Sequence, residues 1–270
     1  MPKSEKTSAQ SSKNGGKDRE SGGAPAVTRA AAILRLLARS EEPLGVNMIA
    51  KTLGLVPSTC LHVLRALVAE TFVRVDPDRK TYTLDAGLLP LAHRLMQQDD
   101  FAQRAQPHLD RIARDFAITA VGTRVIGLRH MVVLALSQPD VVFRLHVDVG
   151  NHYPALISAT GRCVAAFGGH DPETIAEEFQ RLEWEQPPQF AQWSDEVQQG
   201  KELGYSVDAG RYIRGITIIA APVFDAKGTM THAMATVGLT ERQSPESIEA
   251  TGISLRDAGL ALSAAEAVTG

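Results

Sequence analysis

The fold of the N-terminal region is decided by residues 45–84, which read GVNMIAKTLGLVPSTCLHVLRALVAETFVRVDPDRKTYTL. Within residues 46–53, and again within residues 57–67, apolar residues recur every three or four positions, which is the spacing of one helical face. Gly54 lies between the two runs, and glycine often ends a helix because it adopts a left-handed conformation without a steric penalty. Two short amphipathic helices joined by such a turn predict a helix-turn-helix, whose second helix normally enters the major groove of DNA.

A β-hairpin with a basic tip is predicted directly after the second helix. Residues 72–75 and 81–84 have the composition of strands, and the polar turn between them ends in Arg79 and Lys80. A hairpin needed only for folding has no use for two cations at its tip, whereas a wing that contacts phosphates does. The pattern therefore favours a winged helix-turn-helix, although two amphipathic helices and a turn also occur in ordinary helical bundles.

The charge distribution favours DNA contact at the N-terminal end more than the net charge does. The chain has 270 residues and a formal net charge of −3. Residues 1–90 carry 13 lysines and arginines against 9 aspartates and glutamates, whereas residues 91–270 carry 15 against 22. A mildly basic N-terminal part followed by an acidic remainder fits a protein that contacts DNA through one small domain.

Composition limits the class of protein. With 44% hydrophobic and 22% charged residues, the chain can bury a core and is long enough for two domains. Residues 1–25 hold almost no large apolar residue, which predicts a disordered tail without the apolar segment of a signal peptide. No apolar stretch approaches the roughly 18 residues of a membrane span, and the two cysteines lack metal-ligand spacing. We therefore expect a cytoplasmic protein with no membrane contact, no metal and no cofactor.

The segment after the wing carries a broad apolar stripe. One predicted helix presents Leu88, Leu89, Leu91, Ala92 and Leu95, and after a polar break a second presents Ala105, Leu109, Ile112 and Phe116. A stripe this wide on a connecting segment, outside either domain core, predicts a dimer seam. The alternative is that the stripe packs back against its own domain.

The remainder of the chain predicts an α+β domain around an antiparallel sheet, because strand-like and helix-like segments are mixed along it. The expected strands are residues 120–127, 131–136, 141–147, 215–224 and 230–237. The expected helices are residues 161–167, a helix capped by Asp171, residues 194–203 ending at Gly204, and residues 245–265.

The chain resembles the isocitrate-lyase-regulator (IclR) family of bacterial transcription factors. In the N-terminal part the matching residues are Gly54-Leu55, Ser58-Thr59, Leu64 and Tyr82. In the C-terminal part they are Pro154, Ala159 to Arg162, Gly204-Tyr205, Asp208, Gly215 and Ala220 to Asp225. The two groups occur in the family's order, and the resemblance covers about residues 27 to 265.

The resemblance implies a DNA-binding regulator controlled by a small metabolite. Its implied domains are the winged helix-turn-helix at residues 26–87, linker and dimerisation helices at residues 88–106, and a GAF-like effector-binding domain at residues 107–270. Such a protein is expected to bind a palindromic operator in double-stranded DNA as a homodimer or homotetramer.

The expected DNA contacts follow from the helix-turn-helix and the wing. In the second helix the groove-facing residues are Ser58, Thr59, Leu61, His62 and Arg65. Arg79 and Lys80 are expected to contact the DNA backbone, and Arg29 the backbone or the minor groove. The family's frequent basic residue falls here on Pro57, and its frequent His and Arg fall on Leu61 and His62, so the operator sequence does not carry over.

The family's effector pocket falls on ten positions of this chain, namely Val142, Leu145, Tyr153, Ala159, Thr160, Asp208, Ile216, Ile218, Ala235 and Val237. Ile218, Ala235 and Val237 replace residues that are often Cys or Ser, and the acidic pair that commonly follows the aspartate is replaced around Gly210 and Arg211. The effector's identity therefore does not carry over either.

The mostly apolar pocket positions suit a ligand with a ring or a short apolar chain. The N–H groups of the turn Ala159-Thr160-Gly161 could receive a carboxylate. Arg211, next to Tyr212, could contact the same carboxylate, or could pair only with surface acids. The prediction is an aromatic or compact apolar carboxylate.

An enzyme is the alternative class. None of the common hydrolase, zinc-protease, P-loop or dinucleotide motifs occurs, and the histidines are scattered rather than spaced as metal ligands. The alternative is therefore a metabolite-binding enzyme whose helix-turn-helix serves protein contacts, and we expect no catalytic activity.

Overall fold

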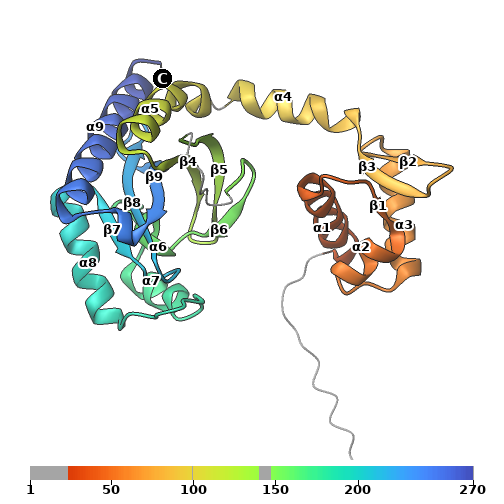
Figure 1. Cartoon of the computed structure of the whole chain (residues 1–270), viewed down its shortest axis with the longest axis horizontal. Helices are drawn as coiled ribbons and strands as arrows, with labels where there is room; N and C mark the ends of the chain where they lie inside the picture. Colours follow the sequence, from red (N-terminus) through yellow and green to blue (C-terminus); the bar gives the residue numbers. More distant parts are fainter. Residues whose placement is uncertain (1–23, 99, 140–146, 270) are drawn as a thin grey trace, which may run out of the picture. The chain divides into compact units, whose positions relative to one another are not determined.

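The computed structural model describes residues 24–98, 100–139 and 147–269, and the chain divides into two compact units, Met1–Gln97 and Gln98–Gly270 (Figure 1). The predicted tail lies outside the described residues except for Ala24 and Pro25, and the first helix already begins at Pro25. The boundary between the units falls inside the predicted linker.

The N-terminal unit is a winged helix-turn-helix, as predicted. Its elements are α1 (Pro25–Arg39), β1 (Leu44–Gly45), α2 (Val46–Thr52), α3 (Pro57–Ala69), β2 (Val73–Asp76) and β3 (Thr81–Leu84). The strands form an antiparallel sheet in the order β1-β3-β2. The core holds Ile33, Leu37, Ile49, Ala50, Cys60, Leu64, Leu67, Val73 and Tyr82. It includes most of the apolar stripes of the two predicted helices, and the other stripe residues, Val46, Leu53 and Val63, are partly buried against it.

The turn between α2 and α3 is set by two residues. Gly54 adopts a positive φ of 62°, which costs glycine little, and Pro57 occupies the first position of α3, where its missing N–H is not needed. The two helices consequently meet at a bend of 113°. Among the described residues no single helix is long and apolar enough to cross a membrane, and this bent pair reaches that length and composition only when its two helices are counted together.

Two helices follow the wing after a short 3-10 turn, Ala86–Leu88. Helix α4 (Leu89–Gln98) leaves Leu89 and Leu91 exposed, at 67% and 59% of their surface, whereas the side chain of Leu95 is not among those described. Helix α5 (Phe101–Phe116) buries its apolar face, including Ala105, Leu109 and Ile112, in the core of the C-terminal unit. The prediction that the stripe on this second helix forms a dimer seam is therefore wrong.

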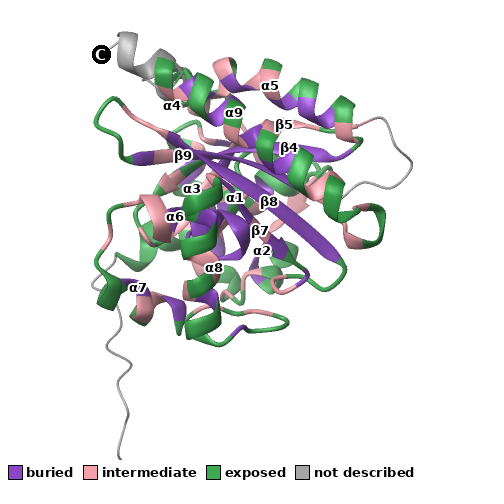
Figure 2. Ribbon diagram, turned by 90° about the vertical axis from the view of Figure 1, so that its left-hand side faces the viewer, coloured by how far each residue is buried: buried purple, intermediate pink, exposed green. Residues whose placement is uncertain are grey.

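The C-terminal unit is built on a six-stranded antiparallel sheet in the order β6-β5-β4-β9-β8-β7, which confirms the predicted α+β class. The strands are β4 (Thr119–Ile126), β5 (His130–Ser137), β6 (His152–Pro154), β7 (Ser206–Ala209), β8 (Ile216–Phe224) and β9 (Met230–Leu239). Strand β8 is buried along nearly its whole length (Figure 2). The predicted strand 141–147 lies outside the described residues except for Val147, which is not in a strand, and the short β6 and β7 were not predicted.

Helices cover both faces of this sheet. One face packs against α5 and α9 (Pro245–Thr269), with Ala120, Ile219 and Met234 between them. The other face packs against α6 (Ser158–Phe167), with α7 (Pro172–Phe179) and α8 (Phe190–Leu203) beyond it, and buries Val121, Ile218 and Ala235. Alternate residues of one strand thus belong to two different cores, because successive side chains point to opposite faces.

Candidate functional site

One face of α3 is free of core contacts. Ser58, His62 and Arg65 are exposed, and they lie three or four residues apart on the side opposite the buried Cys60 and Leu67. Thr59 and Leu61 are half-buried, and Leu61 packs partly against the core of the unit. Of the five predicted groove-facing residues, three are therefore exposed and two are partly buried against their own domain.

The wing presents its cations on a structured turn. Arg79 and Lys80 are exposed between β2 and β3, and the Asp76 carboxylate accepts the backbone N–H groups of Asp78 at 2.9 Å and Arg79 at 3.0 Å. Arg74, which the sequence reasoning missed, is exposed on β2 and donates from Nε to Thr83 Oγ1 at 2.9 Å. Arg29 is exposed near the start of α1.

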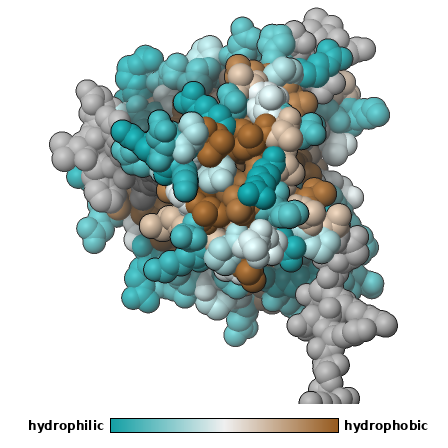
Figure 3. Space-filling model, turned by 90° about the vertical axis from the view of Figure 1, so that its right-hand side faces the viewer, coloured by the Kyte–Doolittle hydropathy of each residue, from teal (hydrophilic) through white to brown (hydrophobic). Residues whose placement is uncertain are grey.

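Apolar side chains also reach the surface of the N-terminal unit. The large ones are Val27, Met48, Val56, Val75, Leu89 and Leu91. Figure 3 shows apolar side chains gathered near the middle of one face, among hydrophilic neighbours. Exposed apolar side chains that lie together often mark an interaction surface.

The C-terminal unit contains a cavity of about 300 Å³ between the sheet and α6. Seven of the predicted effector residues line it, namely Tyr153, Thr160, Tyr212, Ile216, Ile218, Ala235 and Val237. The sequence reasoning missed nine others, namely Val121, Thr123, Met131, Val133, Val147, Ile157, Ser158, Ile213 and Arg214. The strands β4 and β5 contribute four of these nine, because their pairing in the sheet places alternate residues beside those of β9.

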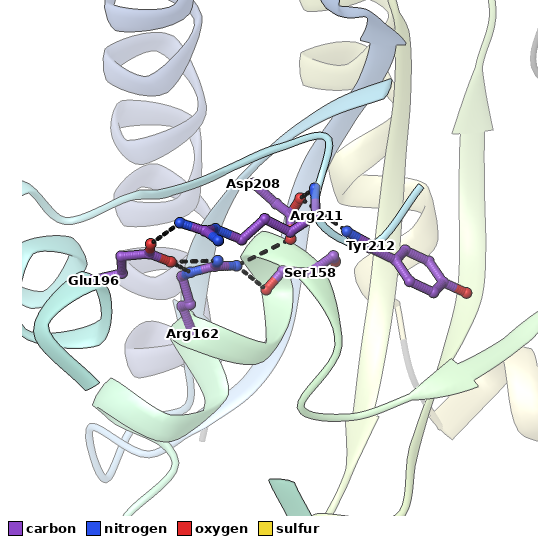
Figure 4. Close-up of polar contacts among 6 residues, drawn as sticks. All are labelled: Ser158, Arg162, Glu196, Asp208, Arg211 and Tyr212. Carbon is purple, nitrogen blue, oxygen red and sulfur yellow. Dashed lines mark hydrogen bonds and ion pairs between the residues drawn. The ribbon is translucent and has the colours of Figure 1, made fainter. Parts of the chain in front are cut away.

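The remaining predicted effector residues do not line this cavity. Ala159 is fully buried in the core, and Asp208 is only 1% exposed within an ion-pair cluster. Arg211 points its guanidinium toward α8 rather than into the cavity, which is a correction to its expected position (Figure 4). Val142 and Leu145 lie outside the described residues.

An ion-pair cluster with a buried centre, Arg162 and Asp208, lies at one end of the cavity. The guanidinium of Arg162, 1% exposed, donates to Glu196 Oε2 at 2.9 Å, to the Ser158 carbonyl oxygen at 2.8 Å and to Asp208 Oδ2 at 3.2 Å (Figure 4). Glu196 Oε1 in turn accepts from Arg211 Nη2 at 3.2 Å. The cluster contains two cations and two carboxylates, so its charges balance, as burial requires.

Asp208 also fixes the loop that follows β7. Its Oδ1 accepts the backbone N–H groups of Arg211 at 2.9 Å and Tyr212 at 3.3 Å. Gly210 and Gly215 have φ values of 81° and 76°, which turn the loop at both ends. As a result the Arg211 side chain faces Glu196, whereas Tyr212 points away from the ion-pair cluster toward the cavity (Figure 4).

Arg214 is the cation that this loop brings to the cavity. Its backbone N–H donates to Glu185 Oε2 at 2.8 Å, and the residue is exposed and belongs to those that line the cavity. Within the described parts of the chain its guanidinium has no ion pair or hydrogen bond. Burial raises the pKa of the Tyr212 phenol, so this neighbour stays protonated and can donate a hydrogen bond.

A single thiol lies near the cavity among the described residues. Cys163, on α6, donates from Sγ to the Ala220 carbonyl oxygen at 3.4 Å, and burial raises the pKa of its thiol to about 12. A thiol that stays protonated is a poor nucleophile. Among the described residues no group of three or more His, Cys, Asp and Glu could hold a metal ion.

Two family models match the chain: the IclR helix-turn-helix domain over residues 26–77 and the C-terminal domain of bacterial IclR transcriptional regulators over residues 93–264. The chain belongs to the IclR family of bacterial transcriptional regulators. It is 31% identical to the glycerol operon regulatory protein of Streptomyces griseus, over 88% of this chain and 94% of that protein. Relatives of this kind are named as transcriptional regulators or repressors, which supports a regulator over the alternative of a metabolite-binding enzyme.

Solved structures of the family share the fold. The IclR regulator of Alicyclobacillus acidocaldarius superimposes with a TM-score of 0.75 and 28% identity, over 90% of this chain and 99% of that one. An IclR homologue from Microbacterium hydrocarbonoxydans, solved with 4-hydroxybenzoate, superimposes with a TM-score of 0.70 and 18% identity, over 91% of this chain and all of that one. IclR-family membership thus accounts for the helix-turn-helix and for the C-terminal domain.

Proposed function

We propose that this IclR regulator binds operator DNA through α3 and the wing, and that an aromatic or compact apolar carboxylate in the cavity controls this binding. The observation that carries the effector class is the cavity itself: apolar side chains such as Ile216, Ile218 and Val133 make most of its wall. A small hydrophilic acid would leave those walls in contact with water, whereas a ring covers them.

The volume agrees with a substituted ring. An apolar cavity of about 150 Å³ is enough to hold benzene. The cavity here, at about 300 Å³, leaves room for a ring with one or two substituents. The Microbacterium homologue, which has the same fold, binds 4-hydroxybenzoate, and this supports a ligand of that size. The residues of the cavity wall are those of this chain and not of the homologue.

The cation proposed for the carboxylate is Arg214. Arg211 is already paired with Glu196, so its charge is largely satisfied without a ligand. Arg214 is a lining residue whose guanidinium has no partner among the described residues, so it is available to a ligand, and Tyr212 in the same loop keeps a neutral phenol that can donate. The N-terminus of α6, with Ser158 and Thr160 on the cavity wall, provides further N–H groups for an anion.

Calorimetry with simple acids tests this effector class. Benzoate and 4-hydroxybenzoate should bind, and Arg214→Gln should weaken benzoate about 10- to 100-fold, because a charge-assisted hydrogen bond is lost. Neutral benzamide should bind both proteins alike. Arg211→Gln is the matched control and should leave the affinity for benzoate nearly unchanged. Tighter binding of pyruvate or glycerol, or a larger loss in Arg211→Gln than in Arg214→Gln, would contradict the proposal.

We propose further that the protein acts as a dimer on a palindromic operator. The exposed Leu89 and Leu91 of α4 provide apolar surface on a segment that belongs to neither core. Two recognition helices held together would contact half-sites about 34 Å apart, or a multiple of it. Sedimentation should show a dimer at micromolar concentration, and Leu91→Asp should lower both dimerisation and operator affinity. A wild-type monomer that binds its operator fully would overturn this part.

A further inference from the structure

We propose that Phe101 is the positioning residue that transmits occupancy of the cavity to the segment connecting the two units. The inference rests on the cavity being the effector site, and it adds a mechanism to it. Phe101 is the first residue of α5 and is fully buried, and in sequence it follows the end of α4 by only three residues. A shift of its ring would therefore move the start of the helix into which the connecting segment runs.

The ring lies on the face of the sheet opposite the cavity, directly over β4. A Cβ built on Gly122 would come within 2.9 Å of Phe101 Cε1 and 3.3 Å of Cζ, so the ring packs on bare backbone. The residues on either side of Gly122, Val121 and Thr123, both line the cavity. Strand β4 thus lines the cavity with the side chains of Val121 and Thr123. Its backbone between these two residues, at Gly122, contacts the Phe101 ring on the opposite face.

Two more features make this point of the sheet able to transmit a shift. The pairing of β4 with β5 changes register between Gly122 and Thr123, so the ladder is locally irregular where the two contacts meet. On the neighbouring strand β9, the buried His232 stacks on the Phe101 ring at 4.2 Å between centroids and 19° between planes. Close-packed contacts of this kind pass small displacements on rather than absorbing them.

The beginning of α5 is also tied to the helix beside it. Arg104 donates from Nε to Asp100 Oδ1 at 2.9 Å and from Nη1 to the Leu262 carbonyl oxygen of α9 at 3.1 Å. The helix start is thus fixed on its α9 side and contacts the sheet through Phe101. A displacement at Gly122 consequently reaches the helix through this ring.

The test measures how far a perturbation of the cavity changes operator affinity, with and without Phe101. Operator DNA is first selected from random duplexes with the full-length protein. The cavity is perturbed by benzoate and, independently of any ligand, by Val121→Phe, whose larger side chain enters the cavity from its wall. In the wild-type background Val121→Phe should shift operator affinity about fivefold or more, the lower end of ordinary coupling between sites.

Phe101→Leu should reduce that shift to less than about twofold, while benzoate affinity changes little. Phe116→Leu is the matched control, because the same change is made at the other end of α5 against the same core, and it should preserve the shift. Gly122→Ala should also disturb the coupling. In the double variant Phe101→Leu/Gly122→Ala the added methyl group refills space that the ring vacates and should partly restore it.

The proposal is overturned if Phe101→Leu keeps the full shift, if Phe116→Leu loses as much, or if Val121→Phe leaves operator affinity unchanged in the wild-type background. Should Phe101→Leu fail to fold, as judged by thermal unfolding, the Gly122→Ala variant decides the matter alone. A response to Val121→Phe without a response to benzoate would contradict the proposed effector class and leave the coupling through Phe101 standing.

Discussion

The two units of this regulator present the residues proposed to bind DNA and effector in opposite ways. In the N-terminal unit, Ser58, His62 and Arg65 are exposed and lie on one face of a single helix. In the C-terminal unit, the cavity lies between the sheet and α6, and its wall is assembled from five neighbouring strands, one helix and residues of the adjoining loops. A surface site follows local periodicity, whereas an interior site follows tertiary pairing, and the two should respond differently to substitution.

The distribution of cysteines allows each unit to be followed separately. The two cysteines of the chain, Cys60 and Cys163, lie one in each unit, and both are fully buried. Burial raises the pKa of both thiols, that of Cys163 to about 12, so neither should react with a thiol reagent at pH 8 in the native protein. Pulse labelling in increasing denaturant then reports the unfolding of each unit by its own cysteine.

The largest expected effect is on the stability of the C-terminal unit. Asp208→Ala leaves the buried Arg162 with one carboxylate fewer and frees the loop that carries Tyr212. Removing one partner of a buried ion pair should cost about 3 kcal/mol of unfolding free energy. Cys163 should become labelled at lower denaturant, while labelling of Cys60 stays at the wild-type midpoint.

The control for that experiment is an exposed ion pair in the same unit. Asp257 pairs with Arg256 on α9 and is 58% exposed, so Asp257→Ala should cost less than about 1 kcal/mol. An equal loss in the two variants would show that the buried cluster has no special role. A matching shift of Cys60 in Asp208→Ala would show that the two units do not unfold independently.

The next effect concerns sequence recognition by α3. Arg65 is exposed on the face that carries Ser58 and His62, so Arg65→Ala should leave both unfolding midpoints unchanged. It should cost about 1–3 kcal/mol of operator binding if the guanidinium contacts a base edge. Fluorescence anisotropy with the operator and with single-base variants checks this. An unaltered base preference would remove Arg65 from direct readout.

A smaller effect is expected at the polar end of the cavity. Tyr212→Phe removes one hydrogen-bond donor and should weaken benzoate binding by about 1 kcal/mol, which is roughly fivefold. Because burial raises the pKa of this phenol above its ordinary value near 10, the wild-type donor stays protonated from pH 6 to pH 9. Calorimetry should therefore give the same ratio of affinities across that range. A ratio that falls with rising pH would mean that the phenol ionises there.

The smallest effect is expected at the wing. Lys80 is an exposed cation at the tip, and Lys80→Ala should weaken binding to all DNA sequences about equally. The slope of log affinity against log salt concentration should decrease by about one. A change in base preference without a change in slope would place Lys80 at a base instead of a phosphate.

The helix-turn-helix and the wing of the N-terminal unit could be predicted because their signals are local, whereas the bounds of α1 and the short β1 were not. The repeated apolar spacing, Gly54 and the basic turn each act over a few residues, and the core of the unit uses those same apolar positions. The prediction of a dimer seam was wrong for α5, because the spacing of apolar residues does not show which surface they pack against. The stripe on α5 has the spacing expected of a seam, yet Leu109 and Ile112 pack against their own sheet.

The cavity could be predicted only in part. The positions inherited from the family included Ile216, Ile218 and Ala235, but the β4 and β5 residues of the wall are specified by strand register, which sequence periodicity does not show. That Arg214 lines the cavity and Arg211 does not has a similar origin, because the loop turns at two glycines with positive φ. The direction of the side chains in this loop depends on Asp208, whose carboxylate accepts the backbone N–H of Arg211. Asp208 lies close to both arginines in sequence, but it is not among the residues that line the cavity.

The separation of the two sites is tested most directly by titrating operator DNA against wild-type, Arg65→Ala and Arg214→Gln proteins at increasing benzoate. The wild-type operator affinity should change with benzoate at low concentration. Arg214→Gln should bind operator as tightly as wild type without ligand and need about 10- to 100-fold more benzoate for the same change. Arg65→Ala should bind operator weakly and keep the wild-type affinity for benzoate, measured by calorimetry. Loss of both activities in either variant, or a wild-type operator affinity that benzoate does not change, would contradict the account.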